Sequence, residues 1–182
     1  SNSAVVTVGS LTPGTASIQS STNVGCYGGS TGSATATISG GTSPYTYVWS
    51  NGQTANTATG LPSGNYTVTV IDANKCSSSQ TVTITQPAAA LSSSVAVTNV
   101  ACSGNPASAS ISAAGGTPAY SYLWSNGRTT ATVTGLANGN YTVTTTDVRG
   151  CTSQKTFNIN ITSTPTVSAS STQAGCTVGN GT

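Results

Sequence analysis

The sequence predicts an all-β protein made of small β-sandwich modules in series, and two observations carry this prediction. Residues 40–52 return as residues 115–127, and residues 59–70 return as residues 134–145, after a shift of about 75 residues. This period is too long for a solenoid unit and suits one small domain. Short runs that alternate apolar with hydroxyl side chains, separated by Gly, Pro and Asn, are typical of strands and tight turns.

The first half of each copy is read from this alternation. In the first copy, residues 34–38 alternate Ala or Ile with Thr, and the Gly- and Pro-containing segment 40–44 ends that strand. The next strand, residues 45–49, places three aromatic side chains on one face. The Asn-Gly pair at 51–52 is the pair best suited to a type I′ hairpin turn.

The second half of the copy continues in the same way. Residues 61–65 form a turn, and residues 66–70 a strand with Tyr and Val on one face. A tight turn at 74–76 leads into a last strand over residues 79–85. No stretch of useful length has helical periodicity.

About seven strands at this spacing predict an immunoglobulin-like sandwich. Trp49 and Trp124 stand where that fold has a core tryptophan on its third strand, and Tyr66 and Tyr141 are placed like its tyrosine corner. Alternation alone leaves open whether Val48 or Trp49 faces the core. The larger burial of an indole ring favours the tryptophan face.

Prolines mark the boundaries of the modules, because proline cannot donate to a strand ladder and suits the exit from a last strand. Both junctions are short and lack a Gly/Ser tract, so we expect neighbouring modules to be semi-rigidly coupled and to run end to end. The boundaries give the last strand of a preceding repeat at 1–14, complete repeats at 15–87 and 88–164, and the start of a following repeat at 165–182.

The five cysteines recur with the modules. Cys26 and Cys76 bracket the same segment of the first copy that Cys102 and Cys151 bracket in the second, which predicts one disulfide within each module. Cys176 opens a further copy and has no partner in this sequence. Buried free thiols are the alternative, whereas the lack of His and of a CxxC pair argues against a metal site. Paired cysteines predict an oxidising, extracellular setting.

Charged side chains are too few for most chemistry. The chain has four Lys or Arg, two Asp, no Glu and no His. Nucleic-acid and anionic-membrane binding need clustered Lys and Arg, and general acid–base catalysis needs a positioned titratable group. We therefore expect no enzyme activity, no catalytic residue, no cofactor and no metal. Asp72 and Asp147 each open the turn before a cysteine, and we expect their carboxylates to cap that turn.

A cluster of aromatic side chains in the first copy allows a second interpretation. Tyr27, Tyr45, Tyr47 and Trp49 could form a platform on which a sugar stacks. A core tryptophan with tyrosines along one sheet explains the same pattern, and we favour that interpretation.

The repeated pattern resembles a known family, the SprB repeat of very large surface proteins in gliding Bacteroidetes-type bacteria. Its motifs are Gly-Gly-Thr-x-x-Tyr-x-Tyr-x-Trp-Ser-Asn-Gly, then Gly-Leu-x-x-Gly-Asn-Tyr-Thr-Val-Thr, then Asp-x-x-x-Cys, within residues 26–87 and 102–164. The copies are more distantly similar to the polycystic-kidney-disease-type domain. The resemblance implies an adhesin exported by the type IX secretion system and moved along the cell surface, and it brings no catalytic residues.

The repeat, the paired cysteines and the missing catalytic groups together predict a segment of a secreted, cell-surface-attached adhesin that forms a stalk or filament. The resemblance implies that this adhesin serves gliding or surface attachment. Its expected partners are neighbouring repeats of the same chain, and surface polysaccharide or other surface and secretion components, without membrane insertion. A carbohydrate-binding module array attached to a polysaccharide-degrading enzyme, and the subunit of an extracellular fibre, are the alternatives.

Overall fold

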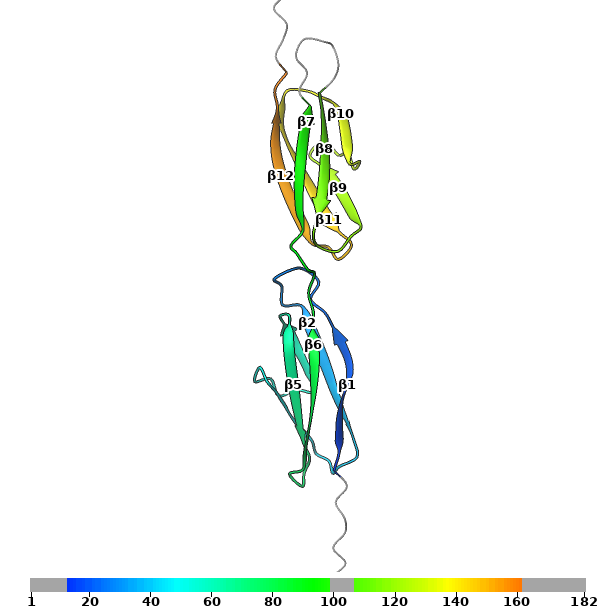
Figure 1. Cartoon of the computed structure of the whole chain (residues 1–182), viewed down its shortest axis with the longest axis vertical. Coiled ribbons are helices and arrows are strands. Elements are labelled where there is room, and N and C mark those ends of the chain that lie inside the picture. Colours follow the sequence, from blue (N-terminus) through cyan, green and yellow to red (C-terminus); the bar gives the residue numbers. More distant parts are fainter. Residues whose placement is uncertain (1–12, 99–106, 162–182) are drawn as a thin grey trace, which may run out of the picture.

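The computed structural model describes residues 13–98 and 107–161, and it places two β-sandwiches one after the other along a single axis (Figure 1). This confirms the predicted all-β, end-to-end architecture. The first sandwich, module 1, contains strands β1 to β6, and the second, module 2, contains β7 to β12. The partial repeats predicted at 1–14 and 165–182 lie outside the described residues, apart from residues 13 and 14.

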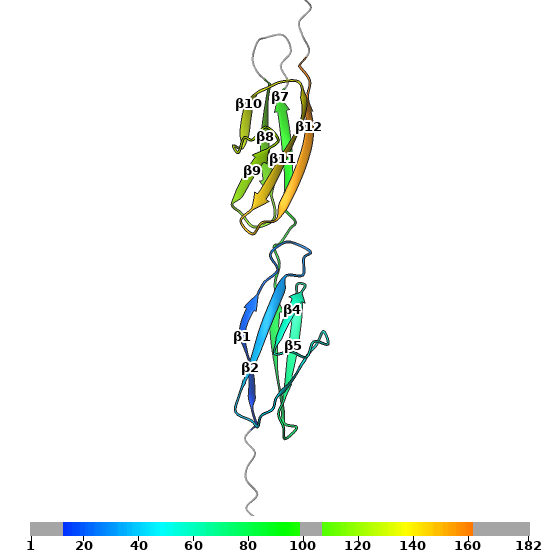
Figure 2. The same ribbon diagram turned by 180° about the vertical axis from the view of Figure 1, so that it is seen from behind.

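Within residues 13–98 and 107–161, each module is built from six antiparallel strands in two three-stranded sheets (Figure 2). Module 1 pairs β1-β2-β4 in one sheet and β3-β5-β6 in the other, and module 2 pairs β7-β8-β10 and β9-β11-β12. The strands of module 1 are β1 Thr15–Thr22, β2 Gly32–Ser39, β3 Thr46–Trp49, β4 Thr57–Leu61, β5 Gly64–Ile71 and β6 Ser77–Ile84. Those of module 2 are β7 Ser92–Thr98, β8 Ala107–Ala114, β9 Tyr120–Trp124, β10 Thr132–Leu136, β11 Gly139–Asp147 and β12 Thr152–Ile159.

This strand order is that of an immunoglobulin-like sandwich. The first sheet corresponds to strands A, B and E of that fold and the second to strands C, F and G. The edge strand D is missing among the described residues, because the chain passes from β3 to β4 through the turn at 50–56. Each module therefore has six strands where the spacing of turns predicted about seven.

A buried tryptophan sits at the centre of each module, as predicted. Trp49 and Trp124 are both 1% exposed, whereas their neighbours Val48 and Leu123 are 42% and 58% exposed. Each indole N–H also finds a backbone acceptor, the Trp49 N–H donating to the carbonyl of Ala55 at 2.9 Å. The burial of the larger ring decides which face of the strand points inward.

The tyrosine corner is present in both modules. The Tyr66 hydroxyl donates to the carbonyl of Pro62 at 3.1 Å, and the Tyr141 hydroxyl donates to that of Ala137 at 3.3 Å. In each case the tyrosine near the start of strand F of the fold, which is β5 or β11 here, bonds back to the turn that precedes it. This bond fixes the corner that joins the two sheets.

Candidate functional site: the junction between modules

Loops gather at the two poles of each module, and their distribution determines which loops of one module face the other. In module 1, the β1–β2 loop (residues 23–31) lies at the pole that faces module 2 (Figure 1). The β2–β3 loop (residues 40–45) and the β5–β6 turn (residues 72–76) lie at the opposite pole. The matching loops of module 2, residues 115–119 and 147–151, face module 1.

In each module, a buried aspartate connects the two loops at the pole where the chain enters. In module 1, Asp72 is 4% exposed, and one carboxylate oxygen accepts the amide of Cys76 at 2.9 Å. The other oxygen accepts the amide of Thr42 in the β2–β3 loop at 3.1 Å. The carboxylate thus caps its own turn, as predicted, and also clamps the neighbouring loop.

Module 2 repeats this clamp. One oxygen of Asp147 accepts the amides of Arg149 and Cys151, both at 2.9 Å, and the other accepts the amide of Thr117 at 2.8 Å. The Thr117 amide is the main reason that the pKa of Asp147 lies below its usual range, with help from the amides of Cys151 and Arg149 and against the effect of burial. The carboxylate is therefore held in its charged form.

A disulfide joins the two modules. Cys26 in the β1–β2 loop of module 1 is bonded to Cys151 in the β11–β12 turn of module 2, with a Cα–Cα distance of 5.7 Å. The predicted bridge within module 1, between Cys26 and Cys76, is therefore wrong. Its counterpart between Cys102 and Cys151 is also replaced, because Cys151 is already bonded. Cys102 and Cys176 themselves lie outside the described residues.

The geometry of the sandwich explains this correction. Cys26 and Cys76 lie at opposite poles of module 1, separated by the length of an eight-residue strand, which is about 25 Å at 3.3 Å per residue. A disulfide needs Cα atoms within about 4.4–6.8 Å of each other. Cys76 is consequently a free, half-buried thiol among the described residues.

The linker that joins the modules is anchored on both sides. On the side of module 1, the Val24 amide donates to the carbonyl of Thr85 at 2.9 Å, the Thr85 amide donates to the Asn23 side chain at 2.9 Å, and the Gly28 amide donates to the Gln86 side chain at 2.8 Å. These bonds hold the β1–β2 loop against the start of the linker.

On the side of module 2, the Gly116 amide donates to the carbonyl of Ala89 at 2.9 Å. A Cβ at Gly115 would collide with the carbonyl oxygen of Ala90, so only glycine allows this close approach. Pro87 and Ala88 remain between the two anchored stretches, and the proline ring fixes its own φ. The linker and the disulfide together give the junction two separate covalent connections.

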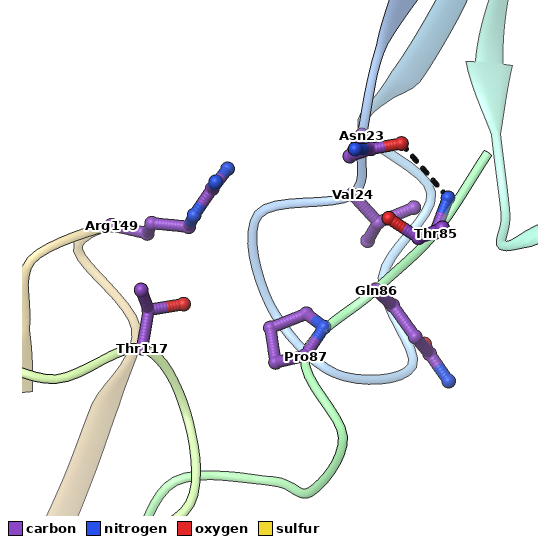
Figure 3. Close-up of a pocket in the computed structure, with 7 residues that line it drawn as sticks. All are labelled: Asn23, Val24, Thr85, Gln86, Pro87, Thr117 and Arg149. Atoms are coloured by element: carbon purple, nitrogen blue, oxygen red, sulfur yellow. Dashed lines mark hydrogen bonds between the residues drawn. The ribbon is translucent and has the colours of Figure 1, made fainter.

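A shallow crevice of about 170 Å³ opens between the modules beside this linker (Figure 3). Thr117 and Arg149 approach it from module 2, facing Pro87 and the β1–β2 loop across the gap. Its lining residues are Asn23, Val24, Thr85, Gln86, Pro87, Thr117 and Arg149. A second one, of about 190 Å³, lies around the disulfide. The two modules thus touch through loops and not through a broad face.

The aromatic side chains considered as a sugar platform do not gather on one surface. Trp49 is in the core, Tyr45 and Tyr47 pack against that core, and Tyr27 projects from the β1–β2 loop, 51% exposed. In the described ranges, no group of three or more His, Cys, Asp or Glu side chains could hold a metal ion. No helix long and apolar enough to cross a membrane occurs there either.

The sequence indicated the residues that form the junction but not which of its cysteines are bonded to each other. It singled out Cys26, Cys151, Asp147 and the linker proline, and it assigned the two cysteines to separate bridges. The signal that could have paired them is their place in the fold: the first loop and the fifth-to-sixth-strand turn lie at opposite poles of an immunoglobulin-like sandwich.

Comparison with known proteins identifies one family. The family model of the SprB repeat matches residues 18–54 and 94–129. Among solved structures, the chain is similar to the amphioxus IgVJ-C2 molecule, with 17% sequence identity, a TM-score of 0.32, and 81% of this chain and 99% of that chain covered. No curated protein matches the chain in sequence.

The two matched segments fall at equivalent places. Residues 18–54 run from β1 past β3, and residues 94–129 run from β7 past β9. SprB repeats belong to cell-surface, adhesin-type repeat proteins, and such repeats and immunoglobulin-like folds are generally non-catalytic. The SprB repeat model therefore matches one segment in each sandwich.

Proposed function

We propose that this chain is a stalk segment of a secreted surface adhesin, in which each repeat holds the next in line. The observation that carries the proposal is the junction. Two sandwiches follow each other along one axis and are connected both by an anchored linker and by the Cys26–Cys151 disulfide. A single flexible linker would let the modules pivot, whereas two connections at separate points oppose bending.

The chemistry of the modules supports a mechanical role over a catalytic one. The carboxylates, Asp72 and Asp147, are buried and occupied by backbone amides, so they hold loops in place. The disulfide requires an oxidising compartment, which agrees with an extracellular position. Gliding or attachment is the process that such a stalk serves.

The stiffness of the junction is tested by NMR on the purified chain. Residual dipolar couplings of the oxidised protein should fit one alignment tensor for both modules. In the Cys26→Ser/Cys151→Ser double variant the two modules should require different tensors. Cys76→Ser is the matched control, because Cys76 is half-buried and unbonded, and it should retain one tensor. Independent tensors in the oxidised wild-type protein would contradict the stalk proposal.

The surface role is tested on intact cells that produce the protein. Antibodies against the chain should label unpermeabilised cells, and deleting the segment should reduce attachment or movement on a solid surface. Replacing it with two unrelated immunoglobulin-like modules of the same length should restore function if the segment acts as a spacer. Retention of the purified chain on polysaccharide arrays, with no rescue by the replacement, would favour the carbohydrate-binding alternative.

A further inference from the structure

Cys76 stands in the same structural setting as the bonded Cys151, one module earlier. Its amide donates to Asp72 at 2.9 Å, as the Cys151 amide donates to Asp147 at 2.9 Å. The backbone bonds that close the two turns also match, since the amide of each aspartate donates to the carbonyl of its cysteine at 3.0 Å. The fold thus presents the two cysteines from equivalent turns, one in each module.

The surroundings of Cys76 are also those of a module junction. In module 2, the incoming linker runs against Gly115 and Gly116. In module 1, the incoming chain does the same, because the position of a Cβ on Gly41 lies 3.3 Å from the amide nitrogen of Gly14. The loop glycines Gly40, Gly41, Gly115 and Gly116 all have positive φ. In module 2, the loop, the entering chain and the cysteine contact the preceding module. The pole at which the chain enters module 1 therefore has the same three features.

We propose that Cys76 is a covalent docking site for a further SprB-type repeat placed before module 1, whose β1–β2 loop brings a cysteine equivalent to Cys26. The same bond, repeated at successive junctions, forms a ladder of disulfides in which each turn cysteine is joined to the loop cysteine of the preceding module. This inference extends the stalk proposal from one junction to a series.

The bond forms by oxidation of two thiols. Each cysteine loses one proton and one electron as the sulfur–sulfur bond forms. The disulfide of a thiol–disulfide oxidoreductase accepts both electrons and both protons and becomes a dithiol. In vitro, oxidised glutathione takes that role and leaves as two molecules of reduced glutathione.

The test extends the chain by one module. A second copy of residues 13–91, with Cys76→Ser in the copy, takes the place of residues 1–14 directly before residue 15, and the protein is folded with oxidised and reduced glutathione. Free thiols are alkylated before digestion with chymotrypsin. In the original chain, cleavage after Leu, Tyr and Phe separates the relevant cysteines into peptides 12–27, 67–91 and 142–157. In the extended chain, the loop cysteine of the copy lies in peptide 13–27 and that of module 1 in peptide 15–27.

Two linked peptide pairs are expected from the extended chain: 15–27 with 142–157, and 13–27 of the added copy with 67–91. The original chain is the matched control and should give only the equivalent of the first pair, 12–27 with 142–157, which excludes a bond between Cys26 and Cys76 of one module. Cys76→Ser in the extended chain should remove the second pair and leave the first. An extended chain that forms the first pair but leaves Cys76 alkylated would overturn the ladder, while the dipolar couplings decide separately on the stalk.

Discussion

Modules 1 and 2 have the same strands and the same aspartate clamps, yet they differ at equivalent positions in their cores and turns. Val70 and Val82 of module 1 correspond to Thr145 and Phe157 of module 2, and all four lie on the paired strands of the second sheet. Phe157 packs edge-on against Trp124 and stacks on Tyr141, both with ring centroids 5.8 Å apart. Module 2 thus gains an aromatic cluster and carries a buried hydroxyl that module 1 lacks.

The comparison separates what the fold requires from what each copy adds. The central tryptophan, the tyrosine corner and the aspartate occur in both modules, so they belong to the fold. The aromatic cluster and the bonded turn occur in module 2 among the described residues. Substitutions at paired positions can therefore test which features stabilise a module by themselves.

The largest effect is expected from the central tryptophans. Trp49→Ala and Trp124→Ala should each destabilise their own module by about 3–5 kcal/mol, because a buried aromatic side chain is lost and leaves a cavity. Trp124→Ala should lie at the upper end, since it also breaks the contact with Phe157. Urea unfolding followed by circular dichroism measures the loss. The remaining tryptophan reports the other module by fluorescence, and a transition of that module shifted equally would contradict independent cores.

Removal of the clamp in module 1 should have the next largest effect. Asp72→Ala leaves the amides of Thr42 and Cys76 without their charged acceptor, and we expect a loss of about 2–3 kcal/mol. Asp72→Asn is the matched variant, since its single carbonyl oxygen can replace one of the two bonds and should recover part of the loss. Thermal unfolding would disprove a clamp role if Asp72→Ala left the stability of module 1 unchanged.

The clamp in module 2 predicts a dependence on pH. The pKa of Asp147 is lowered in the folded protein, so its contribution to stability is complete above the pKa of about 3.9 of an unfolded aspartate. That contribution is lost as the pH falls from there through the lower folded pKa. Unfolding measured from pH 5 to pH 2 should show this loss in the wild type. Asp147→Asn should flatten the profile in that window, and an identical slope in both proteins would contradict the assignment.

A smaller effect of opposite sign is expected from the buried hydroxyl of module 2. Thr145 is fully buried, and its hydroxyl oxygen has no hydrogen-bond partner among the described residues. Thr145→Val should stabilise module 2 by about 1–2 kcal/mol, because an unsatisfied polar group is removed at constant shape. Val70→Thr is the reciprocal test and should destabilise module 1 by a similar amount. A destabilised Thr145→Val protein would indicate that the hydroxyl is bonded in solution.

The smallest effect concerns the turn before the cysteine. Lys75 has a φ of 68°, in the left-handed region that favours glycine, and module 2 has Gly150 at this place with a φ of 83°. Lys75→Gly should stabilise module 1 by about 0.5–1 kcal/mol, because relief of the strain exceeds the added entropy of the unfolded chain. Lys75→Ala keeps the strain and serves as the control in the same unfolding measurement.

Much of this protein is determined by local sequence. The alternation of apolar and hydroxyl residues and the glycine turns predicted the strands, because periodicity in a half-buried strand is a local property. The size of the indole ring predicted which face of β3 and β9 is buried, and the position of Asp72 and Asp147 predicted the capped turns. The repeat itself predicted two equivalent modules, and the short junctions predicted their end-to-end order.

Tertiary structure alone decided the pairing of the cysteines and the bond between each aspartate and the neighbouring loop. Spacing along the chain placed Cys26 with Cys76, but a sandwich sends the first loop and the last turn to opposite poles, about a strand length apart. The partner of Cys26 is therefore Cys151, 125 residues away, brought near by the stacking of one module on the next. Likewise, the hydrogen bond that the Thr117 amide donates to Asp147 joins two loops whose bonded residues are 30 positions apart in the sequence. Distances between poles and loops are set by the packed fold, and no local pattern encodes them.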